Sequence, residues 1–274
     1  MKQVMQQYQE QLHISHSQIF CYLACSLKYQ FQYVQQLPKE RISLALPFGK
    51  AIHHSIERYY RSILDDRTIV SLSLLENLFE ESLTLELDNI EIPVIYKAEA
   101  PDTDSAIAMG KGLLKVFYEN TNLSGMEIVD IELPLSAPLY TGTGEKTDIN
   151  LVGVLDLLLK DAEGNLLVVD NKTSKQKKSQ DAVDDDLQMT AYSYLLAANG
   201  YVFPRAEVNC RFDVLRKLKT PKLEQYFTSR TPAQRKRFAR IANAVLAGIE
   251  NRLFVPIKGW MCADCSYQDA CSKW

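Results

Sequence analysis

The sequence predicts an α/β protein in which a mixed central β-sheet is flanked by helices. Two strongly apolar segments, 151–159 and 166–169, are separated by the short polar turn 161–165, a pattern that predicts a β-hairpin. Stretches with helical periodicity precede and follow this hairpin. The chain has 274 residues, of which 46% are hydrophobic, so it is long enough for a substantial core.

Each expected element follows from local signals of periodicity, turn chemistry and capping. Pro93 and Pro101 interrupt the second half of the helical region, and Asn199 with Gly200 marks a helix end. The acidic run 181–186 predicts a loop and a helix N-terminus, where negative charge is favourable. The expected elements are helices over 15–36, 47–65 and 70–122, strands from about 126 to 172 with a loop at 138–146, a helix ending near 198, strands over 202–215 and 222–229, and a helix over 232–250.

Each strand of the hairpin carries an acid among aliphatic residues. Asp156 lies within the first strand, and Asp170 and Lys172 follow the second. Burying a lone carboxylate is costly unless a cation or a hydrogen bond compensates it. A hard divalent ion such as Mg²⁺, which prefers oxygen ligands, is the natural partner. A metal held by Asp156 and Asp170 can polarise a phosphoryl oxygen and acidify a bound water, while Lys172 orients that water. The alternative is a surface hairpin with a chance D-x-K triplet.

The hairpin and the helix after it resemble the core of the PD-(D/E)xK nuclease superfamily, in its RecB-like branch. The resemblance rests on a G-x-x-D strand at 153–156, an Asp-x-Lys-Thr strand at 170–173 and a helix carrying Gln188 and Tyr192. Gln188 and Tyr192 are four residues apart and share one helix face. The resemblance implies that both line the active site near the metal and the nucleic-acid backbone. Alone, this helix is more often an ordinary amphipathic one, but its position after the Asp-x-Lys strand favours the functional interpretation.

Upstream residues extend the resemblance. The segment 49–57 is similar to the branch's G-x-x-x-H helix start, in which the histidine adds a metal ligand, and this implies His53. A lone histidine is more often an ordinary surface or core residue. A histidine beside carboxylates favours Mn²⁺ more than an all-oxygen site does, so Mg²⁺ and Mn²⁺ both remain candidates. The backbone carbonyl of Asn171 is implied as an assisting ligand, and Glu132 lies where the branch often has another acid.

The C-terminus carries the C-x2-C-x5-C cluster Cys262, Cys265 and Cys271. Three thiolates leave one position open, because structural Zn²⁺ and [4Fe–4S] clusters normally have four protein ligands. The N-terminal segment 14–34 resembles the opening of iron–sulfur RecB-like nucleases, and Cys25 is then the fourth ligand. Cys21, four residues earlier, is the alternative.

The resemblance implies a [4Fe–4S] cluster that joins the two chain ends as a structural staple. Ser26 departs from it, since the family usually has proline after this cysteine, and Zn²⁺ is the competing cofactor. Disulfides are less expected, because residues 1–7 lack the apolar stretch of a secretory signal and no run is long enough to span a bilayer. We expect a cytoplasmic protein, with Cys210 as a buried structural thiol.

The net charge of −3 does not by itself indicate nucleic-acid binding, but a local groove can do this work. Cations gather in three places, each also consistent with a solvated face. These are Lys172, Lys175, Lys177 and Lys178; Arg216, Lys217, Lys219 and Lys222; and Arg235, Lys236, Arg237 and Arg240. Phosphate contact is most reasonable for the first group, which follows the proposed site.

The resemblance implies one nuclease domain over 1–274. Its helical part covers about 60–125, its core about 126–230, and its cluster segments about 15–36 and 258–274. The expected activity is metal-dependent hydrolysis of DNA, as an exonuclease on single-stranded ends, similar to CRISPR-associated exonucleases or to nucleases of DNA repair and recombination. A helicase or integrase partner is implied by family association only. Two alternatives remain: a non-catalytic iron–sulfur module that binds DNA ends, and an RNA-processing nuclease with a zinc staple.

Overall fold

The computed structural model describes residues 12–274, so the expectation about residues 1–7 lies outside it. Its elements, in chain order, are β1 (His13–Ser15), α2 (His16–Ala24), α3 (Ser26–Tyr29), a π-helical turn η1 (Gln30–Val34), β2 (Ile42–Ser43), α4 (Ala45–Asp66), α5 (Leu72–Asp88), β3 (Val94–Ile95), α6 (Thr103–Asn120), β4 (Met126–Tyr140), β5 (Lys146–Asp161), β6 (Leu166–Ser174), α7 (Gln180–Asp184), α8 (Leu187–Ala198), β7 (Val208–Arg216), β8 (Lys222–Arg230), α9 (Pro232–Glu250), a 3-10 turn η2 (Trp260–Asp264) and α10 (Gln268–Ser272).

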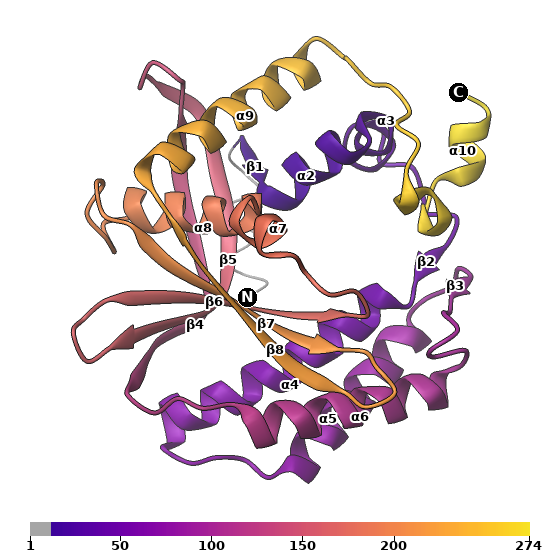
Figure 1. Ribbon diagram of the computed structural model, residues 1–274. Helices are drawn as coiled ribbons and strands as arrows, with labels where there is room; N and C mark the ends of the chain where they lie inside the picture. The colour runs from indigo at the N-terminus through magenta and orange to yellow at the C-terminus, as the bar shows by residue number, and fades with distance from the viewer. Residues whose placement is uncertain (1–11) are drawn as a thin grey trace.

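The predicted α/β fold with a mixed sheet is confirmed (Figure 1). Strands β5, β6, β7 and β8 are neighbours in that order, β4 pairs with β5 along nearly its whole length, and β1 extends the sheet beside the start of β5. The β4–β5, β5–β6 and β7–β8 pairs are antiparallel, whereas β6 and β7 are parallel. The helices α7 and α8 form the crossover between these two parallel strands, as parallel pairing requires.

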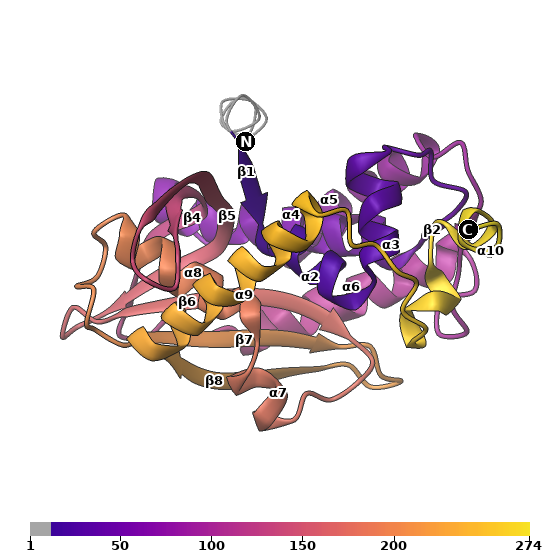
Figure 2. The same cartoon turned by 90° about the horizontal axis from the view of Figure 1, so that it is seen from above.

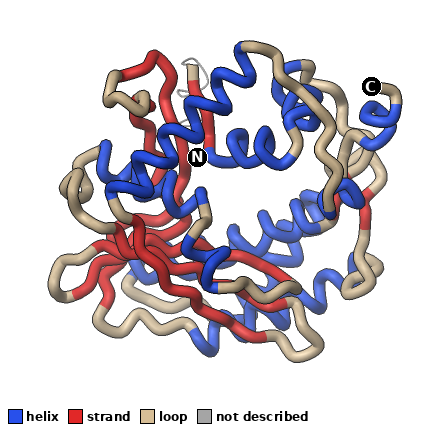
Figure 3. Tube along the Cα trace, turned by 45° about the horizontal axis from the view of Figure 1, so that its top comes forward, coloured by secondary structure: helices blue, strands red, loops and turns tan. Residues whose placement is uncertain are grey.

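Helices cover both faces of the sheet (Figures 1 and 3). Helices α4, α5 and α6 form one layer, whose core contains Phe48, Phe79 and Phe117 together with Leu157 and Val169 of the sheet. Helices α2, α8 and α9 cover the other face, and residues such as Leu155, Val168 and Phe212 of the sheet lie in that core. The prediction of a largely helical stretch before the sheet is therefore confirmed, and it forms one complete layer.

The hairpin β5–β6 forms as predicted, with Gly164 at a positive φ of 87° in its turn. Gly153, the glycine of the G-x-x-D segment, lies beneath helix α8. A Cβ atom there would stand 2.9 Å from Leu195 Cδ1 and 3.5 Å from Tyr192 Cε1. This glycine is thus needed for close packing of α8 on the sheet, and α8 is the helix that carries Gln188.

Three boundary predictions were wrong. The helix predicted over 15–36 is interrupted at Cys25, whose backbone is extended (φ −164°, ψ 102°), because Ser26 and Leu27 hydrogen-bond the C-terminal segment instead of continuing the helix. The strand predicted over 202–215 begins only at Val208. The residues before it, which include Pro204, form turns and bends and do not pair with the sheet. The loop predicted at 138–146 is shorter, because β4 continues its pairing with β5 to Tyr140.

The α3 region near the start of the chain and the C-terminal segment after α9 lie side by side (Figures 1 and 2). Val255 N donates to Ser26 Oγ at 2.9 Å, and Leu27 N donates to the carbonyl of Val255 at 3.1 Å. These bonds hold the C-terminal segment against α3 and so bring the terminal cysteines toward Cys25. Within residues 12–274, no helix combines the length and the apolar character needed to cross a membrane.

Candidate active site and cysteine cavity

The acids of β4 and β5 lie at a bend where the strands pass from one core to the other. In β4, Ile131 belongs to the core under α4–α6 and Leu133 to the core under α8. Glu132 between them has a positive φ of 52°, which reverses the usual alternation of faces. In β5 the same change occurs between Leu155 and Leu157, on either side of Asp156. The two carboxylates are therefore half-buried at the boundary between the two cores.

The histidine predicted from the G-x-x-x-H segment reaches this bend from the other layer. His53, in the first half of α4, places Nδ1 3.3 Å from Asp156 Oδ2. His53, Glu132 and Asp156 each offer a ligand atom, and the three atoms lie within 4.8 Å of one another. Among residues 12–274 this is the one set of three or more His, Cys, Asp or Glu side chains with that spacing. An imidazole and two carboxylates at this spacing suit a divalent cation.

Asp156 is oriented by the adjacent strand. Its Oδ2 accepts a hydrogen bond from the backbone N–H of Asn171 at 2.9 Å. Through this bond, Asn171 of β6 fixes the orientation of the Asp156 carboxylate on β5. The site is therefore built from the hairpin itself, since the two strands hold each other's functional groups in place.

Asp170 is completely buried, on the face of β6 toward α8. Lys172 Nζ lies 2.8 Å from Asp170 Oδ2, so the two side chains share a face as their spacing predicted. Gln188 Nε2 donates to Asp170 Oδ1 at 2.9 Å and approaches Tyr192 Oη at 2.7 Å. The predicted residues Asp170, Lys172, Gln188 and Tyr192 therefore form one connected polar chain. Asp170 is not among the three clustered ligand atoms, because Lys172 and Gln188 contact its carboxylate.

Burial and mutual repulsion raise the pKa of two carboxyl groups in the site. Burial first, then the neighbouring charges of Asp156 and Glu57, raises the pKa of Glu132 to about 8. Burial raises the pKa of Asp170 as well, against the lowering effect of Lys172. Although burial opposes its charge, Lys172 has a raised pKa because Asp170 and Asp156 are close. A cation bound among these acids would relieve this repulsion.

Sequence reasoning gave Glu132 only a secondary place, although it lies with His53 and Asp156. The G-x-x-D and D-x-K patterns contain no reference to β4, so the signals for Glu132 were an acid in an apolar strand and the place of a further acid in the RecB-like branch. His16 was also missed as a neighbour of the site. Burial is the main cause that lowers the pKa of His16 to about 4, and it is close enough to Asp186 and Lys172 for both charges to act on it.

The four predicted cluster cysteines line one cavity of about 770 Å³ between α2, α3 and the C-terminal segment. Cys25, Cys262, Cys265 and Cys271 all contribute to its wall, whereas Cys21 does not. The break of the helix at Cys25 turns this side chain into the cavity. Cys210 is buried in β7, as expected of a structural thiol.

Two of these sulfur atoms accept hydrogen bonds from the backbone. Ile257 N donates to Cys25 Sγ at 3.5 Å, and Gly259 N donates to Cys262 Sγ at 3.4 Å. Among the residues that the structure describes, no three cysteine sulfurs lie within 4.8 Å of one another.

A mixed sheet that gathers acids, a histidine and a lysine between two helical layers is the framework of a hydrolytic nuclease. The chain belongs to the PD-(D/E)XK nuclease superfamily, whose family description matches residues 13–272. The match spans both the hairpin and the cysteine segments.

Comparison with solved structures gives two distant similarities. The protein SSO0001 has 16% identity and a TM-score of 0.38, covering 90% of this chain and 94% of the other. A protein of Eubacterium rectale named "Putative exonuclease" has 14% identity and a TM-score of 0.42, covering 88% of this chain and 91% of the other. No curated protein matches the chain.

Proposed function

We propose that this protein is a metal-dependent DNA nuclease that hydrolyses phosphodiester bonds as an exonuclease on single-stranded ends. The observation that carries this proposal is the position of the Asp170–Lys172 pair. It lies on the strand next to the cluster of His53, Glu132 and Asp156, and the N–H of Asn171 links the two. A lysine beside a candidate metal site is the arrangement needed to activate water against a phosphate.

The donor set fits Mg²⁺ or Mn²⁺. Glu132 is half-buried and has a raised pKa, mainly because burial and the neighbouring carboxylates oppose its charge. An acid of this kind is stabilised by a bound cation. His53, Glu132 and Asp156 would hold the ion, with Asp170 and the carbonyl of Asn171 as further oxygen donors. When bound, the ion supplies Lewis acidity to a phosphoryl oxygen and lowers the pKa of water.

The side chains of the chain itself position the reaction. Lys172 can donate from Nζ to the attacking water and to the developing negative charge on the phosphate. Asp170 keeps this ammonium in place and ionised. Gln188 donates to Asp170 and contacts Tyr192, so it holds the carboxylate from the α8 side and leaves the lysine oriented toward the metal cluster.

We place the protein in the RecB-like branch of the superfamily. The G-x-x-D strand, the D-x-K-T strand and the Gln188–Tyr192 helix support this, because each contributes to one site. By similarity in these motifs the biological setting is CRISPR adaptation or DNA repair and recombination, with a helicase or integrase as partner. These proposals concern the substrate and the pathway, and they rest on motif order.

We further propose a [4Fe–4S] cluster ligated by Cys25, Cys262, Cys265 and Cys271. Four cysteines around one cavity and two N–H donors to sulfur support this assignment. The cluster would join α3 to the C-terminal segment, which is a structural role.

One sample tests both parts. Protein purified without oxygen is examined for its visible spectrum and iron content, then assayed for cleavage of single-stranded DNA and of the matching RNA with Mn²⁺ or with EDTA. About four irons per chain and Mn²⁺-dependent DNA cleavage that Asp170→Asn abolishes would support the proposal. Binding of DNA ends without cleavage in either protein would identify a binding module. Preferential cleavage of RNA by a colourless zinc protein would overturn both the substrate and the cluster.

A further inference from the structure

A second cleft lies at the far end of α8 from Gln188. It has a volume of about 620 Å³ and separates the β4–β5 hairpin loop from the first half of α9. Its wall includes Tyr140, Gly142, Tyr194, Pro204, Arg235 and Lys236. Tyr194 ties the helix to the hairpin, since its hydroxyl donates to the carbonyl of Pro138 at 2.7 Å. This hydrogen bond holds α8 and the β4–β5 hairpin together on one side of the cleft.

The wall of this cleft contains a buried cation that has no acidic partner. Arg235 is buried, and its guanidinium donates only to neutral oxygens. The acceptors are Ser193 Oγ and the carbonyls of Pro204, Ala206 and Arg230. No carboxylate within residues 12–274 lies within 4.0 Å of it. Both Nη atoms are taken up by these oxygens, so Arg235 contributes an unneutralised positive charge to the wall of the cleft and makes no direct contact with a ligand.

Three more cations extend this charge along the exposed side of α9. Lys236, Arg237 and Arg240 are exposed, and none has a carboxylate within 4.0 Å among the described residues. They occupy the first half of a helix that begins at Pro232, where the helix dipole disfavours positive charge. Arg240 also packs on the hairpin loop, because a Cβ at Gly142 would lie 3.2 Å from its Cγ. The cleft is therefore cationic from its wall to its rim.

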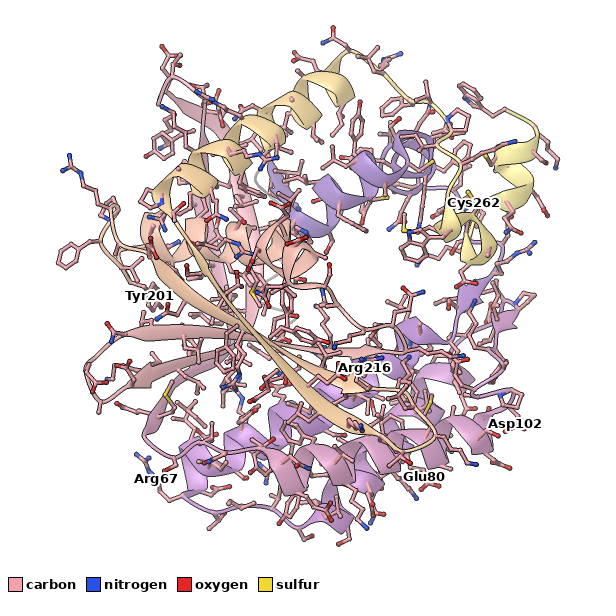
Figure 4. The ribbon with its side chains drawn as sticks, viewed as in Figure 1. Arg67, Glu80, Asp102, Tyr201, Arg216 and Cys262 are labelled. Carbon is pink, nitrogen blue, oxygen red and sulfur yellow. The ribbon has the colours of Figure 1, made fainter. Side chains whose placement is uncertain are left out.

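Exposed aromatic side chains lie in the wall of the cleft and on the loop that supplies Pro204 to it. Tyr140, in its wall, is 40% exposed. The loop that supplies Pro204 also carries Tyr201, which is 41% exposed, and Phe203, which is 82% exposed. Figure 4 shows Tyr201 on the opposite side of the view from Cys262, so this surface is separate from the cysteine cavity. Cations beside exposed aromatic rings are the combination that binds single-stranded nucleic acid, through phosphates and base stacking.

We propose that this cleft is a second binding site for single-stranded nucleic acid, outside the catalytic centre. Phosphates would contact Lys236, Arg237 and Arg240, and bases would stack on Tyr140 or Phe203. An acidic peptide would satisfy the cations but would leave the aromatic rings unused. The single acid of the hairpin loop, Glu145, faces Thr143 and does not pair with these cations.

The cleft and the candidate active site occupy opposite ends of one helix. Gln188 and Ala198 are ten residues apart on α8, which corresponds to about 15 Å along the axis. A strand that enters the cleft could thus extend toward the metal cluster only if it is several nucleotides long. The passage of one strand from the cleft to the metal cluster rests on the proposed nuclease function. Binding of a strand in the cleft itself does not.

The test compares strands of two lengths in EDTA, where cleavage cannot occur. Fluorescently labelled oligonucleotides of about 4 and about 20 nucleotides are titrated at several salt concentrations. Lys236→Gln/Arg240→Gln is expected to weaken binding of the longer strand at least fivefold and to reduce its log–log salt slope by about 1.4, since two phosphate contacts are lost. Phe203→Ala is expected to weaken the same binding without changing the slope.

A matched control removes two exposed cations elsewhere. Lys115→Gln/Lys160→Gln changes the net charge equally, on α6 and at the far end of β5, and should leave affinity and slope unchanged. Equal loss in both double variants, or equal competition by poly-glutamate of the same charge, would overturn the proposal, because either shows only unspecific attraction of anions. Wild-type protein that binds but never cleaves would reject the nuclease function and leave this site intact.

Discussion

Glu132 of β4 and Asp156 of β5 lie opposite each other at the point where both strands change from one core to the other. The pairs Ile131–Leu157 and Leu133–Leu155 bracket them, and Glu132 adopts a φ of 52°. A left-handed backbone at a glutamate is unfavourable by about 1–3 kcal/mol, and such strain persists where the surrounding structure enforces it. Here the left-handed backbone directs the Glu132 side chain toward His53. In an ordinary strand, the same side chain would point into a hydrophobic core.

Glu132 should make the metal-free protein sensitive to pH. The unfolded chain releases this proton near pH 4.5, whereas the folded protein retains it until about pH 8. The folded state therefore binds more protons in this window, and its contribution to stability falls as pH rises from about 4.5 to about 8. Melting temperatures in EDTA should follow this direction, and Glu132→Gln should flatten the change between these pH values. A Glu132→Gln profile that parallels the wild type would contradict the assignment.

Asp156→Asn should lose metal binding while the fold remains. The amide keeps the size of the side chain but removes the charge that His53 and the Asn171 N–H surround. We expect at least about tenfold weaker Mn²⁺ binding, with cleavage reduced by about a hundredfold or more. Calorimetric titration with Mn²⁺ alone measures the first effect. His54→Gln, on the same helix but outside the three-residue cluster, is the matched control.

Lys172→Met should lower kcat by about 10²–10³ and change KM little, because its ammonium acts on charge that develops in the transition state. The variant leaves Asp170 buried without the cation that lowers its pKa, so the carboxyl becomes neutral. We therefore expect the variant to fold, as judged by thermal melting. A large rise in KM with kcat retained would assign Lys172 to substrate binding.

Two glycines provide opposite tests of packing. Gly153→Ala places a Cβ 2.9 Å from Leu195 Cδ1, which should reduce the free energy of unfolding by about 1–3 kcal/mol. Gly49 lies inside α4 with no atom within 4 Å of the position of a Cβ, so Gly49→Ala should raise stability by up to about 1 kcal/mol. Chemical denaturation of both variants measures the difference. Any cleavage lost in a more stable Gly49→Ala protein would indicate that substrate needs this open space.

Cys25 and Cys21 should differ in their effect on bound iron. Cys25 lines the cavity with the three C-terminal cysteines, and Cys21 does not. Cys25→Ala is expected to lose the visible absorption and most of the iron, and to lower the melting temperature. Cys21→Ala should retain both. If the two variants retain iron equally, Cys25 is not a ligand.

The sequence by itself determined the β5–β6 hairpin, its acids Asp156 and Asp170, and Lys172, which follows them in the chain before α8. Alternation within β5 and β6 and the four-residue spacing of Gln188 and Tyr192 are local properties, so local patterns were sufficient. The mixed sheet and the helical layer before it followed for the same reason. The C-x2-C-x5-C spacing likewise placed three cysteines together without any tertiary information.

Only the tertiary structure decided that Glu132 joins His53 and Asp156, and that Asp170 is engaged by Lys172 and Gln188. The first depends on the reversal of faces at one residue of β4, and the second on how closely α8 packs over Gly153. The break at Cys25 arose from hydrogen bonds to Val255, 230 residues away in the chain. Contacts between residues so distant in sequence are set by the packing of whole layers, and no local pattern encodes them.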